Sequence, residues 1–239
     1  IRDREKSVGR ENLELDFFGG EPLMNFDVVK QTVAYARSQE KEYGKNFRFT
    51  ITTNGMLLDD DAIDFINKEM YNVVLSIDGR KEVNDRMRVR ADGNGSYDRI
   101  VKNFKKLVEK RGDKEWYVRG TYTKYNLDFS EDVFHLYDQG FDQISVEPVV
   151  EDPKVEYAIT EEDLDQICKE YDRLADRLME LKKNGGFLNF FHFMIDLEQG
   201  PCVIKRLRGC GSGNEYVSIT PDGDCLLYTS PSPRDGLLS

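Results

Sequence analysis

The feature that most constrains this chain is a regular alternation of apolar strand-like segments with helix-like segments. The segments predicted as strands are 12–18, 47–55, 72–79, 115–123 and 143–150, and the predicted helices are 27–43, 59–69, 96–110, 130–139 and 161–183. Apolar strands that alternate with helices pair in parallel, and right-handed connections place the helices outside the sheet. The sequence therefore predicts an α/β fold in which the carboxyl ends of all strands meet at one rim, where ligands bind.

Length and charge narrow the class of protein. The 239 residues suffice for one large α/β domain or two small ones. A formal net charge of -11 argues against a nucleic-acid partner, because nucleic-acid-binding domains are usually basic. No run of about 18 apolar residues exists, so no membrane partner is expected. The opening "IRDREKSVGREN" is neither a signal peptide nor a natural start. We therefore expect a cytoplasmic protein whose sequence here begins inside a longer chain.

Four of the predicted strands end in short polar or glycine-containing sequences. They are GGEP at 19–22, TTNG at 52–55, SIDG at 76–79 and VEPV at 146–149. A glycine directly after a strand lets a ligand approach the backbone closely, and Glu21 could accept hydrogen bonds from a ligand ammonium. Each of these loops taken alone is explained as well by an ordinary turn. Their occurrence at successive strand ends favours a binding site.

Polar side chains at and after the strand ends suit a ligand that carries hydroxyl and carboxylate groups. The short side chains suited to ribose hydroxyls are Asn54, Ser76 and Asp78. The segment NDRMRVR at 84–90 supplies three arginines, one of which could hold a carboxylate through two hydrogen bonds. Glu147 could face a substrate, but it could equally pair with Arg119.

These residues resemble the motifs of radical S-adenosylmethionine (SAM) enzymes. FFGGEPLMN at 17–25 resembles the family motif whose backbone and glutamate hold the methionine amino group, which would assign SAM binding to Gly19, Gly20, Glu21 and Pro22. TTNG and SIDG resemble the next two strand ends of that family. NDRMR resembles the segment whose arginine pairs with the SAM carboxylate, matched here by Arg88, and Val146 lies where the family packs an apolar residue against adenine.

The resemblance covers about residues 11–224 and carries expectations for fold and cofactors. It implies a partial (β/α)6 barrel that binds SAM and a [4Fe–4S] cluster. An electron from that cluster cleaves SAM to a 5′-deoxyadenosyl radical, which abstracts a hydrogen atom from the substrate. An electron donor such as ferredoxin or flavodoxin is therefore an implied partner.

A second resemblance lies at 202–225, CVIKRLRGCGSGNEYVSITPDGDC. It resembles the start of a SPASM domain, the extension that carries auxiliary iron–sulfur clusters in peptide-modifying radical SAM enzymes. By this resemblance Cys202 and Cys210 are metal ligands, and thiolates suit such clusters chemically. Two ordinary buried thiols are the alternative. Cys168 lies within the apolar pattern of a helix and is predicted to be a core residue.

The expected domains follow from these resemblances. Residues 1–195 would form the radical SAM core, and 196–224 the start of the SPASM domain. The segment CLLYTSPSPRDGLLS at 225–239 resembles translated adapter sequence, so we expect a non-native tail. A native disordered tail is the alternative.

The segment 117–153 is most similar to the maturases of six-cysteine peptides, called SCIFF maturases. This implies thioether cross-links between a peptide cysteine and the α-carbon of another residue, with a cysteine-rich precursor peptide as partner. A sister SPASM enzyme, such as an anaerobic sulfatase maturase, and a non-catalytic nucleotide- or peptide-binding module stay open as alternatives.

The C-x3-C-x2-C triplet that holds the catalytic cluster in this family does not occur among the 239 residues. In the family the triplet precedes the GGEP strand. We therefore interpret its absence as truncation and expect the chain to be inactive by itself, with its catalytic residues unknown.

Overall fold

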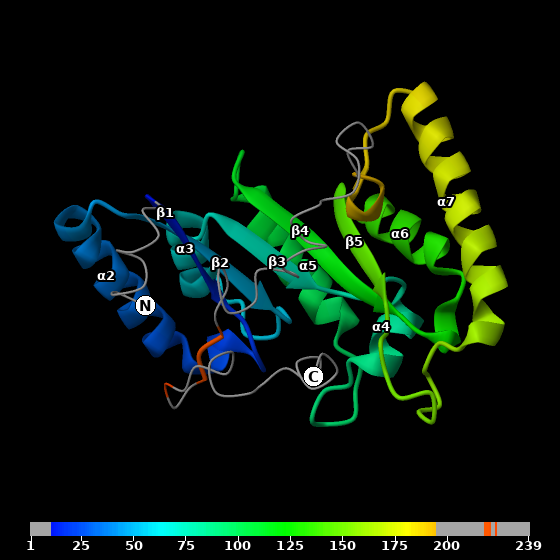
Figure 1. Ribbon diagram of the computed structural model, residues 1–239, viewed down its shortest axis with the longest axis horizontal. Helices are drawn as coiled ribbons and strands as arrows, with labels where there is room; N and C mark the ends of the chain where they lie inside the picture. The colour runs from blue at the N-terminus through cyan, green and yellow to red at the C-terminus, as the bar shows by residue number, and fades with distance from the viewer. Residues whose placement is uncertain (1–10, 195–217, 221–222, 224–239) are drawn as a thin grey trace, which may run out of the picture. The chain divides into compact units, whose positions relative to one another are not determined.

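The computed structural model describes residues 11–194, 218–220 and 223, and the chain divides into two units, Ile1–Met194 and Ile195–Ser239. In the first unit six parallel strands form one sheet in the order β1-β2-β3-β4-β5-β6 (Figure 1). The strands are β1 (Asn12–Phe17), β2 (Asn46–Thr53), β3 (Asn72–Ser76), β4 (Glu115–Tyr122), β5 (Gln143–Pro148) and β6 (Asn189–Phe190). Because neighbours in sequence are neighbours in the sheet, right-handed connections all pass over the same face. The predicted α/β partial barrel is confirmed.

Within the described residues, six α-helices and four 3-10 turns connect or follow these strands. The helices are α2 (Phe26–Tyr43), α3 (Asp60–Glu69), α4 (Lys81–Met87), α5 (Tyr97–Glu109), α6 (Phe129–Asp138) and α7 (Leu164–Lys183) among the described residues. The 3-10 turns there are η1 (Pro22–Asn25), η2 (Lys124–Asn126), η3 (Glu161–Asp163) and η4 (Phe191–Phe193). The sequence analysis did not predict α4 or β6. Helix α4 has only seven residues, most of them polar, and β6 has two, so neither offers a readable apolar period.

The core lies between the helices and one face of the sheet. Along β2, Phe49 and Ile51 are fully buried on that face, and Val118 of β4 lies there too. Helices α5 and α6 contribute Phe104 and Leu136, which are also fully buried. Removing one such side chain from water contributes about 1.5–3 kcal/mol. The amphipathic helices are therefore held by the strand residues that point toward them.

The opposite face of the sheet, which we call the inner face, carries mainly polar side chains. By strand alternation it includes Asp16, Thr52, Ser76, Tyr117, Arg119, Thr121, Ser145 and Glu147. Burial raises the pKa of Tyr117 on this face; the charge of Arg119 opposes this, and the charges of Glu147 and Asp16 add to it.

Three expectations meet different outcomes in the structure. Cys168 was predicted in the core, and this is wrong: its side chain is exposed on α7, where Ile167 and Glu170 are the buried neighbours. The segments 196–224 and 225–239, with Cys202 and Cys210, lie outside the described residues except for 218–220 and 223, so they remain predictions. Among the described helices, none combines the length and the apolar character needed to cross a membrane.

Candidate functional site

Glu21 joins the first two strand ends at the carboxyl rim. Its Oε1 accepts hydrogen bonds from the Leu23 amide at 3.1 Å and from the Thr53 hydroxyl at 2.9 Å. Its Oε2 accepts one from the Asn54 amide at 2.7 Å. The first bond caps η1, and the other two attach the GGEP loop to the TTNG loop. An ionised carboxylate has about four acceptor sites, so the geometry leaves Oε2 able to accept one further bond from a ligand.

The two glycines before Glu21 present open backbone. Gly19 has a φ of 120°, a conformation that favours glycine. A Cβ built on Gly19 or Gly20 meets no heavy atom of the described residues within 4 Å. None of the described residues therefore fills the space beside these two glycines, and a ligand that lies against this main chain stays a prediction.

A cavity of about 710 Å³ lies next to this loop. Met24 from η1, Asn54 from the loop after β2, and Arg88 after α4 line it, together with Arg90 and Arg99. Asn54 shapes its own turn, because its Oδ1 accepts from the Met56 amide at 3.0 Å. The fold thus brings Asn54 and Arg88, two residues proposed from sequence alone, to one cavity beside the GGEP loop.

Asp78 and Arg88, both predicted to contact a ligand, bind each other. Arg88 donates from Nε to Asp78 Oδ2 and from Nη2 to Oδ1, each at 2.8 Å. Asp78 is 3% exposed, and its Oδ1 also accepts from the Thr121 amide at 3.0 Å. Asp78 is therefore committed to the protein, and a ribose hydroxyl would have to compete for it. Arg88 also lines the cavity.

Arg119 is a candidate that the sequence analysis mentioned only as a partner of Glu147. It lies on the inner face in register with Ser76 of β3, and 41% of its side chain is exposed. Its Nη2 donates to Glu147 Oε2 at 2.6 Å, which confirms the pairing considered from sequence. Strand alternation in YVRGTYT carries the signal, since it places Arg119 on the face opposite the buried Val118.

The Arg119–Glu147 pair is ionised at neutral pH. Burial raises the pKa of the Glu147 carboxyl, but the hydrogen bond and charge of Arg119 outweigh it and hold that pKa below its ordinary value. The hydrogen bond from Arg119 to Glu147 in turn raises the pKa of the guanidinium. The Ser145 hydroxyl donates to Glu147 Oε1 at 3.2 Å and fixes the carboxylate further. The inner face thus holds one fixed cation and one fixed anion side by side.

Val146 occupies the other face of β5. It is in register with Gly120, is fully buried, and belongs to the core between sheet and helices. Its side chain could contact an adenine on the inner face only if the core opened. We therefore carry only the backbone of Val146 into the proposed site.

Cluster ligands cannot be placed in the described part of the chain. There, no group of three or more His, Cys, Asp or Glu side chains is arranged to hold a metal ion. Cys202 and Cys210 fall outside that part.

Residues 10–121 match the family model of the Radical SAM superfamily. This segment belongs to the radical SAM superfamily. The chain is 31% identical over 108 residues to the cysteine-type anaerobic sulfatase-maturating enzyme of Clostridium novyi, covering 45% of this chain and 29% of that protein. It is 26% identical over 135 residues to the radical SAM cyclopropyl synthase TigE of Paramaledivibacter caminithermalis, covering 56% of this chain and 25% of TigE. The chain thus spans less than a third of the length of these two relatives.

Solved structures show the same fold. The structure of anSMEcpe with bound AdoMet and the Kp18Cys peptide superimposes with a TM-score of 0.69 at 19% identity, covering 80% of this chain and 53% of that one. Streptococcus suis SuiB bound to S-adenosylmethionine gives a TM-score of 0.61 at 20% identity, covering 95% of this chain and 51% of that one. The radical SAM segment therefore has the partial barrel of this superfamily.

Proposed function

We propose that this chain is the SAM- and peptide-binding part of a radical SAM peptide-modifying enzyme. The observation that carries the proposal is the rim at which Glu21 joins two loops beside open glycine backbone, next to an inner face with a fixed ion pair. Superfamily membership of residues 10–121 supports SAM as the ligand. A structural neighbour with bound AdoMet and peptide supports a peptide as the substrate class.

Different residues at the carboxyl rim would bind different parts of SAM. The backbone of Gly19 to Pro22 and the remaining acceptor site on Glu21 would hold the methionine ammonium. The hydroxyl of Ser76 and the amide of Asn54 would serve the ribose. These groups lie at strand ends or directly after them, so the sheet positions them.

Two arginines are candidates for binding the SAM carboxylate. Arg88 was expected to hold it, but two of its nitrogens already bind the nearly buried Asp78. Arg119 lies on the inner face in register with Ser76 and is the more exposed of the two. We therefore propose Arg119 as the carboxylate partner, and Arg88 as the residue that positions Asp78 and the cavity wall.

A [4Fe–4S] cluster supplies the electron that cleaves SAM in this superfamily. The described residues hold no group that fits such a cluster. The chain's own residues are therefore assigned only to binding and orienting SAM and the peptide. Cys202 and Cys210 remain proposed ligands of an auxiliary cluster.

The finer proposal concerns the reaction. The similarity of residues 117–153 to SCIFF maturases supports thioether formation between a cysteine sulfur and an α-carbon in a cysteine-rich precursor peptide. An anaerobic sulfatase maturase is the second candidate, because one such enzyme is 31% identical over 108 residues. A non-catalytic module that binds SAM or peptide is the third.

One experiment separates these candidates. The full open reading frame that includes these residues is produced anaerobically, supplied with iron and sulfide, and incubated with SAM and dithionite. Formation of 5′-deoxyadenosine supports the radical SAM enzyme, whereas SAM binding without it supports the binding module. A cysteine-rich peptide that loses two hydrogen atoms per cross-link supports thioether formation. Oxidation of a sulfatase-derived cysteine peptide instead would support the maturase alternative.

A further inference from the structure

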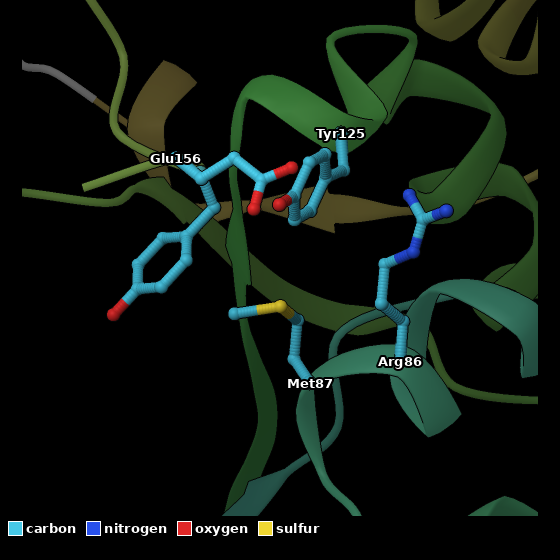
Figure 2. Close-up of a pocket in the computed structure, with 5 residues that line it drawn as sticks. Arg86, Met87, Tyr125 and Glu156 are labelled. Atoms are coloured by element: carbon cyan, nitrogen blue, oxygen red, sulfur yellow. The ribbon is translucent and has the colours of Figure 1, made fainter.

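A second hollow lies at the carboxyl rim, away from the GGEP loop. Its volume is about 450 Å³, and three separate segments line it (Figure 2). Arg86 and Met87 come from α4, Tyr125 from η2, and Glu156 and Tyr157 from the segment after β5. The backbone amide of Lys124 donates to the Tyr157 carbonyl at 3.1 Å, so two of these segments are joined to each other.

The side chains in this hollow are arranged around the ring of Tyr125. The guanidinium carbon of Arg86 lies 4.6 Å from the ring centroid. Burial raises the pKa of the Tyr125 hydroxyl, and the nearby Glu156 carboxylate raises it further. Figure 2 shows Arg86 and Glu156 on either side of the ring, with Met87 below it. Within the described residues Arg86 has no carboxylate partner, so its charge is available to a ligand.

One segment lines both this hollow and the proposed SAM cavity. Arg86 and Met87 line the hollow, while Arg88, Val89 and Arg90 line the cavity. The two bonds from Arg88 to Asp78 fix this segment to the end of β3. A ligand in the hollow would therefore lie next to a wall of the cofactor cavity.

We propose that this hollow docks the peptide substrate through an acidic side chain of the peptide that binds Arg86 and an apolar neighbour that packs on Met87 and Tyr125. The proposal rests on the proposed function. A guanidinium binds a carboxylate through two hydrogen bonds, and Arg, Tyr and Met are enriched in binding surfaces. The net charge of -11 repels acidic peptides in general, so an arginine that pairs with no carboxylate of the described residues is a local point of attraction for an acidic side chain.

The chain offers a matched control for this site. Arg48 lies 4.8 Å from the ring centroid of Tyr71, whose hydroxyl donates to Glu115 at 3.0 Å. The same three residue types therefore lie together, with an equivalent arginine–tyrosine contact, near the amino ends of the strands, and none of them lines either hollow. A substitution at Arg48 removes an equivalent cation–π contact without touching the proposed docking site.

The test uses the full-length protein and two labelled cysteine-rich peptides that differ only in carrying Leu-Glu or Leu-Gln at one position. We expect wild-type protein to bind the glutamate peptide at least about fivefold more tightly, which corresponds to the lower bound for an important interface contact. Arg86→Met should abolish this preference, whereas Arg48→Met should keep it. A preference that survives Arg86→Met, or no preference in the wild-type protein, would overturn the docking proposal.

Failure of the docking proposal and failure of the proposed function give different results. Formation of 5′-deoxyadenosine by the wild-type full-length protein tests the proposed function without reference to the hollow. Thermal unfolding of both methionine variants shows whether either has lost its fold. Should Arg86→Met unfold, Tyr125→Phe keeps the ring but removes the hydroxyl next to Glu156, and the peptide preference should persist because Arg86 carries it.

Discussion

Arg88 donates two hydrogen bonds of 2.8 Å to the carboxylate of Asp78, and one oxygen of that carboxylate also accepts from the Thr121 amide. A single, almost buried carboxylate therefore connects the loop after β3, the segment after α4 and the end of β4. Sequence reasoning assigned both side chains to a ligand. Their pairing makes them the structural support of the rim beside the proposed SAM cavity.

Replacing Arg88 by alanine should destabilise the fold because Asp78 would lose two charged hydrogen bonds while it stays buried. We expect the free energy of unfolding to fall by about 2 kcal/mol. Arg90→Ala is the control. Both side chains of the Arg90–Asp92 pair are exposed, so its loss should lower the free energy of unfolding by less than about 1 kcal/mol. Urea denaturation measures both values. Equal effects in the two variants would show that the Arg88–Asp78 pair is no stronger than a surface pair.

The assignment of the SAM carboxylate to Arg119 predicts an order of effects between two lysine substitutions. Lysine keeps the positive charge but cannot donate two parallel bonds to a carboxylate. Arg119→Lys should weaken SAM binding by about tenfold, the equivalent of one charged hydrogen bond. Arg88→Lys should weaken it less. Equilibrium dialysis with the reconstituted full-length protein measures both, and a reversed order would return the carboxylate to Arg88.

The Arg119–Glu147 pair predicts a pH dependence of stability. The pKa of Glu147 in the folded protein lies below its ordinary value of 4.5, although burial opposes this. The ionised carboxylate therefore stabilises the fold above pH 4.5, and this contribution is lost as the pH falls through the lowered pKa. Glu147→Gln removes it, so the variant should lose less stability than wild type over that acid range. Parallel pH profiles of unfolding midpoints would contradict the prediction.

Glu21 should have a structural role that can be separated from its role toward a ligand. Glu21→Ala removes an N-cap and two bonds to the TTNG loop and should cost about 1–3 kcal/mol. Asp59→Ala removes the N-cap of α3, a 2.8 Å bond from the Ala62 amide, and should cost about 1 kcal/mol. Only Glu21→Ala should also lower SAM affinity and speed hydrogen exchange at the Asn54 amide. Loss of SAM binding in both variants would indicate a general effect of stability.

The alternation of strands and helices was readable from sequence because burial on one face imposes its own period. Side-chain partners were less predictable, since the choice of Arg88 for Asp78 depends on how α4 folds back, and α4 itself has no clear apolar period. The wrong prediction for Cys168 was an error of helical phase: it directly follows the buried Ile167, which places it about 100° away around the helix. The buried Val146 shows the same limit in a strand, where one residue reverses the face.

Gly20 offers the sharpest test of whether a ligand lies against the GGEP backbone. A Cβ at this position meets no atom of residues 11–194, 218–220 or 223 within 4 Å, and its backbone is not in the region reserved for glycine. Gly20→Ala should therefore change the free energy of unfolding by no more than about 0.5 kcal/mol. If SAM packs on this backbone, the added methyl group occupies the space that SAM would fill. We then expect SAM affinity to fall by more than about tenfold, because overpacking of a close contact is unfavourable.

Gly120→Ala gives the opposite pattern and serves as the comparison. The Cβ of the introduced alanine would lie 2.6 Å from the Ile77 carbonyl oxygen and 2.9 Å from the Asp78 Cα. Because both are backbone atoms, the main chain itself would have to move to relieve the clash. This variant should lose about 1–3 kcal/mol of stability from overpacking. Calorimetry for stability and dialysis for SAM affinity, made on both variants of the full-length protein, separate a fold effect from a ligand effect. Unchanged SAM affinity in Gly20→Ala, with an intact fold, would remove the GGEP backbone from the proposed site.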